Sequence, residues 1–589
     1  MEKIYQKDRT QMSSVAPTGM LRILSLPSLD YLWLSLIILL TYAIFLVAHP
    51  LLVPVEARYS EVAREMLVNH QFITPQVNGI DFFDKPILFY WLQAIAMAVF
   101  GVNAWAIRLW PMLFGLFGVL IIFSTCKHLF NRRAAWVMAM MLASSPLYYF
   151  TAHYANLDLE VAVLITASLC FFIRAYQHET NTFSAKWLYA SYAAAGLAIL
   201  TKGLIGIAFP IMIIGLWILF TNQWSLLRQT RIAHGLGLIL LITLPWFIAV
   251  EYVNPGFSYY FFYVQQFLRF LTASFNNREP FWFYLPVVLV GILPWSLYLF
   301  MAFKNYIKQK NVISTFFVIW AATIFVFFSI PHSKLIGYIV PAIPPLAVLA
   351  GQAYLAAEEK TKKLIANIYM VILELVLIGI WLIPAHLSYF IGFTLTLKLI
   401  YSVAFVLLLA LLGYISYAKP RFIFASLVTI NFILFNLVLA SYLLIKPIAL
   451  THFFPVKELT HQIKPFMQPN DDIISYFDYY QDLPMYTGKQ VLMVHHWDKP
   501  NLANHDNWRG EFAYAAKYLQ PEAKDILLSP EQFNQLWNTK QRLFVFLPVR
   551  YLIVLEEAVS PSVVCIIGQA NKIMVVTNDN QICHTSLTH

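Results

Sequence analysis

Long apolar runs recur along this chain from residue 31 to residue 446. A helix needs about 20 apolar residues to cross the roughly 30 Å hydrocarbon core of a bilayer. Thirteen runs approach this length, near 31–50, 108–126, 134–151, 159–176, 187–201, 203–220, 232–251, 282–302, 312–329, 335–353, 363–384, 391–416 and 421–446. Only 12% of the residues are charged, against about 25% in a soluble domain. We therefore predict a polytopic α-helical membrane protein with about 13 transmembrane helices.

Basic residues between these runs predict the topology, because Lys and Arg accumulate in cytoplasmic loops. The basic segments are the N-terminus, 127–133, 174–186, 228–231, 304–310, 360–363 and 419–421. All of them face the cytoplasm only if the apolar stretch 86–103 makes no net crossing. We therefore expect 86–103 to lie in the outer interface or to re-enter it. The net charge of +10 reflects this bias and does not indicate nucleic-acid binding.

The prediction divides the chain into three parts. Residues 1–30 form a cytoplasmic N-terminus, 31–446 form the transmembrane domain with a first outer loop at 51–107, and 447–589 form a domain outside the cytoplasm. In this last part strand-like runs (472–477, 490–496, 542–549, 551–557 and 572–578) alternate with helix-like segments (456–466 and 530–538). This pattern predicts a small α/β domain.

The four cysteines are divided between these parts. Cys126 and Cys170 lie in apolar runs, where we expect packing roles. Cys565 and Cys583 lie in the C-terminal domain, where an oxidising compartment would permit a disulfide. The sequence leaves open whether the two are joined.

Charged residues concentrate in the first outer loop, between residues 54 and 86. They are Glu56, Arg58, Glu61, Arg64, Glu65, Asp81, Asp84 and Lys85. Their spacing predicts a short amphipathic helix over 56–68 that lies on the membrane. For Glu61, Arg64 and Glu65 we favour a solvated face with i,i+4 ion pairs.

Two pairs of charged residues at the ends of this loop have two interpretations each. Glu56 and Arg58 stand beside the end of a span, where they either stay solvated or point into a cavity. Asp84 and Lys85 precede Pro86, where they either cap a helix or bind an anionic group.

Other outer loops also carry charges at the membrane boundary. Asp158 lies where a loop meets a span; such ionisable residues are usually functional, and a helix cap is the alternative. Lys202, Arg269 and Lys334 lie on the outer side against the topological bias, which favours a contact with an anion. The three prolines in 335–353 predict irregular backbone, which membranes tolerate where it is packed or lines a cavity.

The outer face thus collects five basic side chains and three acids. They are Arg58, Lys85, Lys202, Arg269 and Lys334, with Glu56, Asp84 and Asp158. The cations suit a lipid phosphate or pyrophosphate, and the acids could act as a base, orient an acceptor or bind a metal. No cofactor is assigned; a divalent metal stays open, with Asp84 as its candidate ligand.

Several stretches of this chain resemble one family of membrane proteins. They are PVEARYSEVAREML, ITPQVNGIDFFDKPILFYWL, YANLDLE, LTKGLIG, FFYVQQFLRF, EPFWFYLPVVLVGILPW and SKLIGYIVPAIPPLA, with SYFDYYQDLPMYTGKQV in the C-terminal domain. In this order, over residues 30–350 and beyond, they are similar to bacterial relatives of the protein O-mannosyltransferases. The likeness is closest to the aminoarabinose transferases that modify lipid A.

The resemblance implies a fold and a reaction. It implies a GT-C fold with 13 transmembrane helices, interfacial helices and a periplasmic α/β domain. It also implies inverting transfer of a sugar from undecaprenyl phosphate to an acceptor at the outer leaflet of the bacterial inner membrane. By motif match, Asp84 and Lys85 form the family's acid-Lys-Pro element. Asp158 is the acid of the second loop, and Tyr338 is the Tyr of the SKL motif.

The chain departs from the family pattern at two positions. The first motif usually reads Asp-Glu-x-Arg-Tyr, whereas here Val55 replaces the first acid, which bears on the identity of the base. The aminoarabinose transferases carry a His in the aromatic loop where this chain has Gln266, which bears on a metal and on aminoarabinose as the sugar.

These residues lead to a hypothesis about mechanism. We assign catalysis to Glu56, Asp158 and Lys85, with Glu56 as base or acceptor orienter and Asp158 second. We assign substrate binding to Arg58, Tyr59, Asp84, Lys202, Arg269, Lys334 and Tyr338. Preplaced cations would stabilise the departing polyprenyl phosphate.

The acceptor is left open between two hypotheses. Lipid A or another lipid comes first, and a protein hydroxyl is the alternative. A transporter or flippase for lipid-linked sugars is the alternative of another class. It would predict charges in mid-span and two matching halves, and the sequence has neither.

Overall fold

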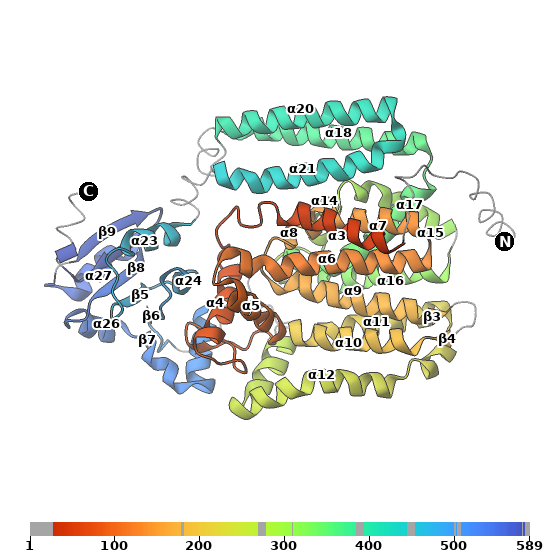
Figure 1. The fold of residues 1–589 in the computed structure, drawn as a ribbon. Coiled ribbons are helices and arrows are strands. Elements are labelled where there is room, and N and C mark those ends of the chain that lie inside the picture. The colour runs from red at the N-terminus through yellow and green to blue at the C-terminus, as the bar shows by residue number, and fades with distance from the viewer. Residues whose placement is uncertain are drawn as a thin grey trace.

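The apolar runs fold into helices that lie side by side in one bundle (Figure 1). The computed structural model describes residues 27–177, 182–268, 278–308, 310–384, 394–444, 454–499, 502, 508–562, 564–579 and 581–582. The long helices are α3 (Pro27–Ala43), α6 (Ala104–Leu129), α7 (Arg132–Ala143), α9 (Leu157–Ala175), α10 (Ala185–Lys202), α11 (Ile205–Thr221), α12 (Ile232–Val253), α16 (Val312–Ser329), α17 (Ile343–Ala356), α18 (Glu359–Leu382), α20 (Leu395–Ala418) and α21 (Ile423–Leu444).

The bundle identifies the chain as a multi-pass membrane protein. In the part that the structure describes, seven helices are long and apolar enough to cross a membrane, or eight if one bent pair counts as a span. Helices α3 and α11, at 17 residues each, are slightly shorter than that length. Helices form at each of the thirteen predicted runs, whereas thirteen crossings remain an expectation.

Two of the predicted spans are broken, because proline removes a backbone donor and clashes with the preceding turn. The run 134–151 divides into α7 and α8 (Pro146–Thr151), and Pro146 begins the second helix. The run 282–302 divides into α14 (Tyr284–Gly291) and a second part made of η3 (Trp295–Tyr298) and α15 (Leu299–Lys308). These two parts meet at 105° next to Pro294.

The proline-rich run 335–353 folds as predicted. It starts as an irregular 3-10 segment, η4 (Ile336–Ala342), before α17 begins. At the centre of the bundle, α9 packs against α6, α10, α11 and η4. Because α9 is buried along nearly its whole length, its first turn lies in a well-packed place.

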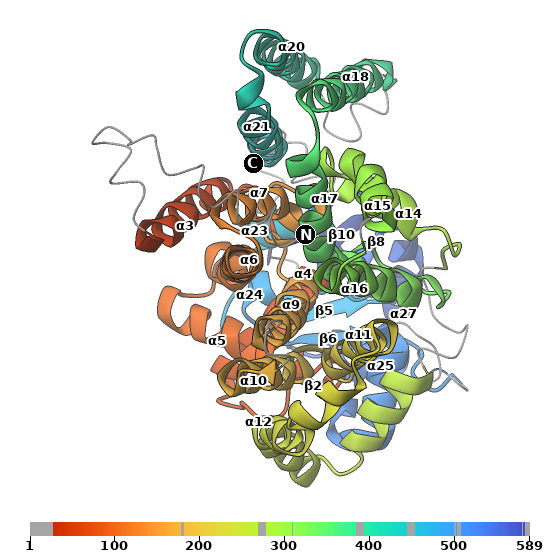
Figure 2. The same cartoon turned by 90° about the vertical axis from the view of Figure 1, so that its right-hand side faces the viewer.

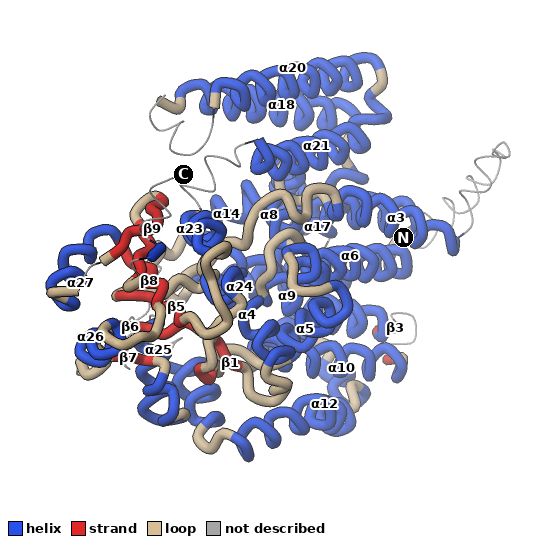
Figure 3. The backbone as a smooth tube through the Cα atoms, turned by 60° about the vertical axis from the view of Figure 1, so that its left-hand side comes forward, coloured by secondary structure: helices blue, strands red, loops and turns tan. Residues whose placement is uncertain are grey.

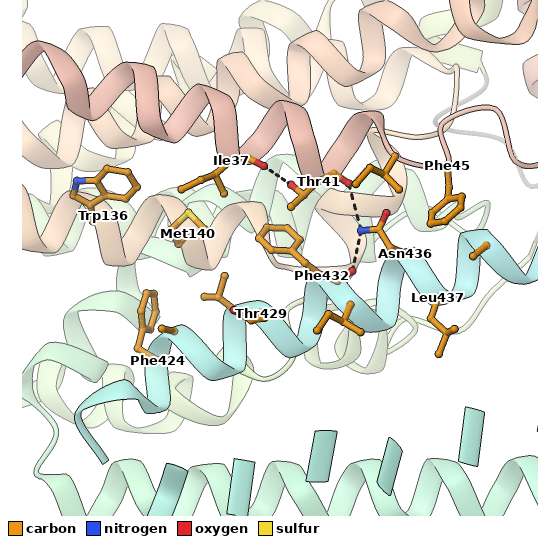
Figure 4. A pocket seen from close by; sticks show the side chains of 15 residues that line it. Ile37, Thr41, Phe45, Trp136, Met140, Phe424, Thr429, Phe432, Asn436 and Leu437 are labelled. Carbon is orange, nitrogen blue, oxygen red and sulfur yellow. Dashed lines mark hydrogen bonds between the residues drawn. The ribbon is translucent and has the colours of Figure 1, made fainter. Parts of the chain in front are cut away.

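Helices α18, α20 and α21 form a separate group at one side of the bundle (Figure 2). A groove with a cavity volume of about 830 Å³ separates α21 from α3 and α7. Apolar side chains line most of it, and two of its polar side chains donate hydrogen bonds to backbone carbonyls (Figure 4). Thr41 donates to the Ile37 carbonyl, and Asn436 donates to the Phe432 carbonyl of its own helix.

The first outer loop folds against the end of the bundle. It contains α4 (Val55–Val68), a hairpin of β1 (Gln76–Val77) and β2 (Ile80–Asp81), and α5 (Leu88–Phe100). At 13 residues, α5 is about 20 Å long, too short to cross a bilayer. This length agrees with the expectation that 86–103 makes no net crossing.

The predicted amphipathic helix exists as α4, but its charged face is not solvated. Glu61 is fully buried, and Arg64 and Glu65 are 8% and 5% exposed. Arg64 pairs with Glu61 at i,i+3 rather than i,i+4, and Glu65 accepts a hydrogen bond of 2.9 Å from the Gly79 amide. The C-terminal domain covers this face, so the prediction of solvent exposure was wrong.

The strands of the C-terminal domain lie at one end of the molecule, beyond α4 (Figure 3). They are β5 (Asp472–Tyr476), β6 (Val491–Val494), β7 (Leu527–Leu528), β8 (Leu543–Pro548), β9 (Cys565–Ala570) and β10 (Ile573–Thr577). Their order is β7-β6-β5-β8-β10-β9; β7, β6, β5 and β8 are parallel, and β10 runs antiparallel to both β8 and β9. In register, Ile474 pairs with Leu492 and with Val545.

Helices cover both faces of this sheet. They are α23 (Pro455–Ile463), α24 (Leu483–Thr487), α25 (Trp508–Tyr514), α26 (Pro530–Trp537) and α27 (Leu552–Val559). Alternation along the strands produces two cores: Ile473 packs with α23 on one face, and Ile474 packs with α26 and α27 on the other. The middle strand β8 is buried throughout.

The α/β prediction is confirmed for this domain except at residues 551–557. That segment forms most of α27 instead of a strand. Its buried residues Leu555 and Val559 are four apart, which is helical spacing. Cys565 is disulfide-bonded, and Cys583 lies outside the described residues. Cys126 and Cys170 are buried free thiols, as expected.

Candidate functional site

Helix α4 lies between the helix bundle and the C-terminal domain (Figure 1). It packs on α5 from the membrane part and on α24 from the C-terminal domain. Its first turn follows directly after Pro54, so its charged residues start at the boundary of the bundle. The candidate site is built around this helix.

Glu56 is held in a fully buried ion pair with Arg108 at the start of α6. The Arg108 guanidinium donates two bonds of 2.7 Å, one to each carboxylate oxygen, and neither side chain is exposed. Glu56 also accepts from the amides of Leu52 and Ala155. Burial alone would raise the pKa of Glu56, but Arg108 outweighs burial and lowers this pKa. The charged carboxylate of Glu56 therefore links α4 to α6 and to the loop that contains Ala155.

Arg108 also holds the segment that leads into α4. It donates to the carbonyls of Leu46, His49 and Pro50, at 2.9 to 3.0 Å. Our sequence reasoning missed Arg108, although a charge at the start of an apolar run was a usable signal.

Arg58 lies two residues after Glu56 along α4 and contacts the C-terminal domain. Its Nε donates to Gln481 Oε1 at 2.8 Å, and its Nη1 pairs with Glu511 Oε2 at 3.2 Å. Its guanidinium carbon lies 5.7 Å from the centre of the Phe82 ring. Burial would lower the pKa of Arg58, but the Glu511 carboxylate raises it. Gln481 lies in the C-terminal stretch that resembles the family but was not singled out, and Glu511 carried no signal in the sequence.

Asp84 is 5% exposed and lies among polar groups of the aromatic loop. Its Oδ1 accepts from Gln265 Nε2 at 2.9 Å and from the Tyr260 hydroxyl at 3.3 Å. The Lys85 ammonium donates to the Asp84 carbonyl at 2.9 Å. Helix α5 begins without a side-chain cap, so the capping interpretation of Asp84 and Lys85 was wrong.

Asp158 lies in the first turn of α9, paired with Lys202 from the end of α10. The cap of α9 is Asn156, which also donates to Asp158 Oδ2 at 3.0 Å. The Lys202 ammonium lies 4.5 Å from the centre of the Tyr338 ring. Gly337 packs so closely on Asp158 that a Cβ there would overlap the carboxylate.

Tyr59 joins these groups into one cluster. Burial raises the pKa of its phenol; nearby Arg58 acts to lower it, and Asp84, Asp158 and Tyr338 act to raise it. The structure thus brings six predicted residues together: Arg58, Tyr59, Asp84, Asp158, Lys202 and Tyr338. Lys85 lies next to Asp84.

The remaining predicted residues lie elsewhere. Lys334 is 3% exposed and donates to the carbonyls of Glu279 and Pro331, which joins its own loop to the segment before α14. Burial lowers its pKa. Arg269 lies outside the described residues, as does the side chain of Gln266. Within the described ranges, no three His, Cys, Asp or Glu side chains gather in a metal-binding arrangement.

Comparison with known proteins shows which proteins this chain is similar to. A family model described as dolichyl-phosphate-mannose-protein mannosyltransferase matches residues 31–261. An undecaprenyl phosphate-alpha-4-amino-4-deoxy-L-arabinose arabinosyl transferase of Shewanella sediminis is 31% identical over 53% of this chain and 57% of its own length. A protein of the same name from Edwardsiella ictaluri is 32% identical over 57% of this chain and 62% of its own length. The matches thus span only about three fifths of these relatives.

A solved structure matches nearly the whole chain. The crystal structure of ArnT from Cupriavidus metallidurans bound to undecaprenyl phosphate has a TM-score of 0.82 and 25% sequence identity, and the match covers 95% of this chain and 99% of ArnT. The apo state of the same protein has a TM-score of 0.79. The helix bundle, the interfacial helices and the C-terminal sheet domain are therefore those of a GT-C fold. This chain is similar to the protein mannosyltransferases over residues 31–261 and to ArnT along nearly its whole length.

Proposed function

We propose that this protein transfers a sugar from undecaprenyl phosphate to lipid A or another lipid at the outer face of the bacterial inner membrane. The main support is the match along the whole chain to ArnT bound to undecaprenyl phosphate. The names of the matched relatives favour an amino sugar of the arabinose type. The charged cluster around Tyr59, at the end of the bundle, is our candidate for the place of reaction.

We place the N-terminus in the cytoplasm and the C-terminal domain in the periplasm. Helix α6 carries Arg108 near one end and Lys127 near the other. At the end far from Arg108, Lys127 and Arg132 pair with Asp30, at 3.1 and 2.7 Å. A basic cluster there agrees with the cytoplasmic bias of Lys and Arg, and it supports a periplasmic position for the candidate site.

The groove between α3, α7 and α21 supports a lipid substrate. It lies among helices of the membrane part and is lined almost entirely by apolar side chains (Figure 4). Its lining runs from Phe424 to Ala440 on α21, about 24 Å at 1.5 Å per residue. Close to its Ala440 end, the Tyr442 ring lies 5.3 Å from the ring of His49, beside the Arg108 pair. We assign this groove to a hydrocarbon chain of the lipid acceptor.

The chemistry of transfer needs cations at the departing phosphate. Charges placed before the reaction in a water-poor site stabilise such a leaving group most effectively. Lys85, Arg58 and Lys202 are our candidates. Lys85 binds the Asp84 carbonyl, Arg58 precedes Tyr59 on α4, and Lys202 pairs with Asp158. The Lys334 ammonium instead binds the carbonyls of Glu279 and Pro331.

The acids take different roles in this proposal. Both oxygens of Glu56 are committed to Arg108, so we assign it to positioning rather than to proton transfer. Asp158 becomes the candidate base or acceptor orienter; a hydroxyl acceptor would gain about 10²–10⁴-fold from such a base, whereas a lipid phosphate is already ionised. Asp84 binds neutral amide and phenol groups, and no step is assigned to a metal.

A protein hydroxyl is the alternative acceptor. The match of residues 31–261 to the protein mannosyltransferase model favours it. The same cations would serve, and Asp158 would then be needed as a base. The two acceptors differ in what the cell loses when the gene is removed.

The test compares lipid A and periplasmic glycoproteins by mass spectrometry, with and without the gene. A sugar lost from lipid A supports the lipid acceptor, and a glycan lost from protein with unchanged lipid A supports the alternative. Purified Lys85→Ala and Asp158→Asn variants should then lose most transfer from the undecaprenyl phosphate-linked sugar. Full activity in both variants would contradict the proposed site.

A further inference from the structure

The C-terminal domain reaches into the candidate site at one point. Arg58 of α4 makes two side-chain bonds, and both partners belong to that domain: Gln481 follows β5, and Glu511 lies on α25. Because the two bonds engage Nε and Nη1, they fix the plane of the guanidinium. A charge-assisted bond to a carboxylate is about twice as strong as a neutral one. Glu511 is therefore the stronger of the two constraints.

Helix α25 also contacts the opposite wall of the site. Tyr514 lies three residues after Glu511, and its ring centre is 4.6 Å from that of Tyr260. The Tyr260 hydroxyl in turn donates to Asp84 at 3.3 Å. Burial raises the pKa of Tyr260, and the charges of Asp84 and Glu511 raise it further. Helix α25 thus contacts Arg58 through Glu511 and the Asp84 group through Tyr514.

This position explains what Glu511 does for Arg58. Asp84 is close enough to act on the charge of Arg58, and it would be the nearest alternative partner for a guanidinium that was not held. The bonds to Glu511 and Gln481 instead hold the Arg58 guanidinium against the C-terminal domain.

The domain is docked by other contacts that do not involve Arg58. Asn78 in the β1–β2 hairpin exchanges two bonds of 2.7 Å with the backbone of Val491 in β6. Gln520 accepts from the Asp81 amide at 2.9 Å and donates to the Gly79 carbonyl at 3.0 Å. Loss of Glu511 should therefore leave the domain in place.

We propose that Glu511 is a positioning residue of the transfer site, which holds Arg58 in its working orientation and makes the C-terminal domain part of that site. The inference rests on the proposed function, because Arg58 acts there on the substrate phosphate.

The test measures kcat/KM for transfer from undecaprenyl phosphate-linked 4-amino-4-deoxy-L-arabinose to lipid A by the purified full chain. Glu511→Ala should lower kcat/KM about tenfold, the usual effect of losing one charged hydrogen bond. Glu511→Gln keeps an oxygen acceptor and should stay within about threefold of the wild type. In an Arg58→Ala background, Glu511→Ala should have an effect of less than about twofold, because the two residues then act as a unit.

The matched control is Gln520→Ala, which weakens the docking of the same domain without contacting Arg58. Its thermal midpoint should fall at least as far as that of Glu511→Ala while its kcat/KM stays at the wild-type value. Equal loss of kcat/KM in Gln520→Ala, an unchanged value in Glu511→Ala, or the same loss with and without Arg58 overturns the inference. If the wild-type chain transfers no sugar from this donor, the proposed function fails and the inference fails with it.

Discussion

The role that we propose for Glu56 depends on a partner far away in the sequence. The place of Glu56 beside a span end indicated a special role, and the structure confirms that it is buried and charged. Whether Glu56 acts as a base or as a positioning residue depends on its ion pair with Arg108, which lies 52 residues away in the sequence. Removing one partner of such a buried pair typically costs about 3–5 kcal/mol. The local sequence could not reveal this partner.

Gly337 offers a test of Asp158 that leaves every charged group in place. A methyl group at Gly337 would overlap the Asp158 carboxylate and force it away from Lys202. Gly337→Ala should therefore lower kcat at least about tenfold, as misplacement of a catalytic group does. A steady-state transfer assay measures this loss.

Gly379→Ala is the control for this substitution, because nothing lies within 4 Å of a Cβ at that position. It should keep wild-type activity. Equal activity in Gly337→Ala and Gly379→Ala would mean that the position of Asp158 does not matter for transfer.

Asp482 should make stability depend on pH. It is 2% exposed, and burial raises its pKa to about 7, above the ordinary value of 3.8. The folded state then binds a proton that the unfolded state has lost, so the contribution of Asp482 to stability falls as pH rises from about 4 to about 7. The full difference is on the order of 4 kcal/mol.

Asp482→Asn removes this titration. Its thermal midpoint in detergent should exceed that of the wild type at pH 8 and approach it at pH 4. A constant difference between the two proteins over this range would assign the pH dependence to other groups.

At the scale of elements, hydrophobic pattern predicted most of the fold. The long apolar runs predicted the helices, and the shorter strand-like runs predicted β5, β6, β8 and β10. The errors have physical causes: prolines broke two runs, and the segment 551–557 is apolar enough to suit a strand or a helix. The charged face of α4 was read as solvated because its cover, the C-terminal domain, lies about 400 residues further along the chain.

The groove beside α21 can be tested by filling it. Thr429→Trp places a large ring among its lining residues and should lower kcat/KM for a lipid acceptor severalfold, since that chain loses its place. Val438→Trp is the control, because Val438 lies on the same helix, is 37% exposed and does not line the groove. Equal kcat/KM in the two variants would show that the groove does not bind the lipid acceptor.

At the scale of the whole molecule, the site is assembled from parts that no local pattern connects. Residues of α4, α9, α10 and the aromatic loop were predictable, because each stands at a membrane boundary where charges are rare. Gln481 and Glu511 were not, because polar residues are common in a domain surrounded by water. The family resemblance covered the membrane part best; it included the stretch with Gln481 without singling that residue out, and it did not reach Glu511.

Asn78 should hold the two parts of the molecule together. It is fully buried, it has a positive φ of 55°, and both its bonds go to Val491. Asn78→Ala loses two hydrogen bonds and adds backbone strain, so it should cost about 2–4 kcal/mol. Hydrogen exchange at residues 491–494 should accelerate accordingly.

Asn78→Gly provides the comparison, because glycine adopts this backbone conformation without strain. It should cost less than Asn78→Ala by about 1 kcal/mol. Unchanged exchange in both variants would show that other contacts dock the domain.

The contact between Arg58 and Glu511 can form only late in synthesis, because the ribosome makes Arg58 long before Glu511. The two residues are 453 positions apart, so at about 5–20 residues per second the ribosome makes the second about half a minute to a minute and a half after the first. Throughout that interval the early helices already occupy the membrane while Arg58 lacks its carboxylate. A chain released early would be inserted yet incomplete, and only a finished polypeptide carries the whole site.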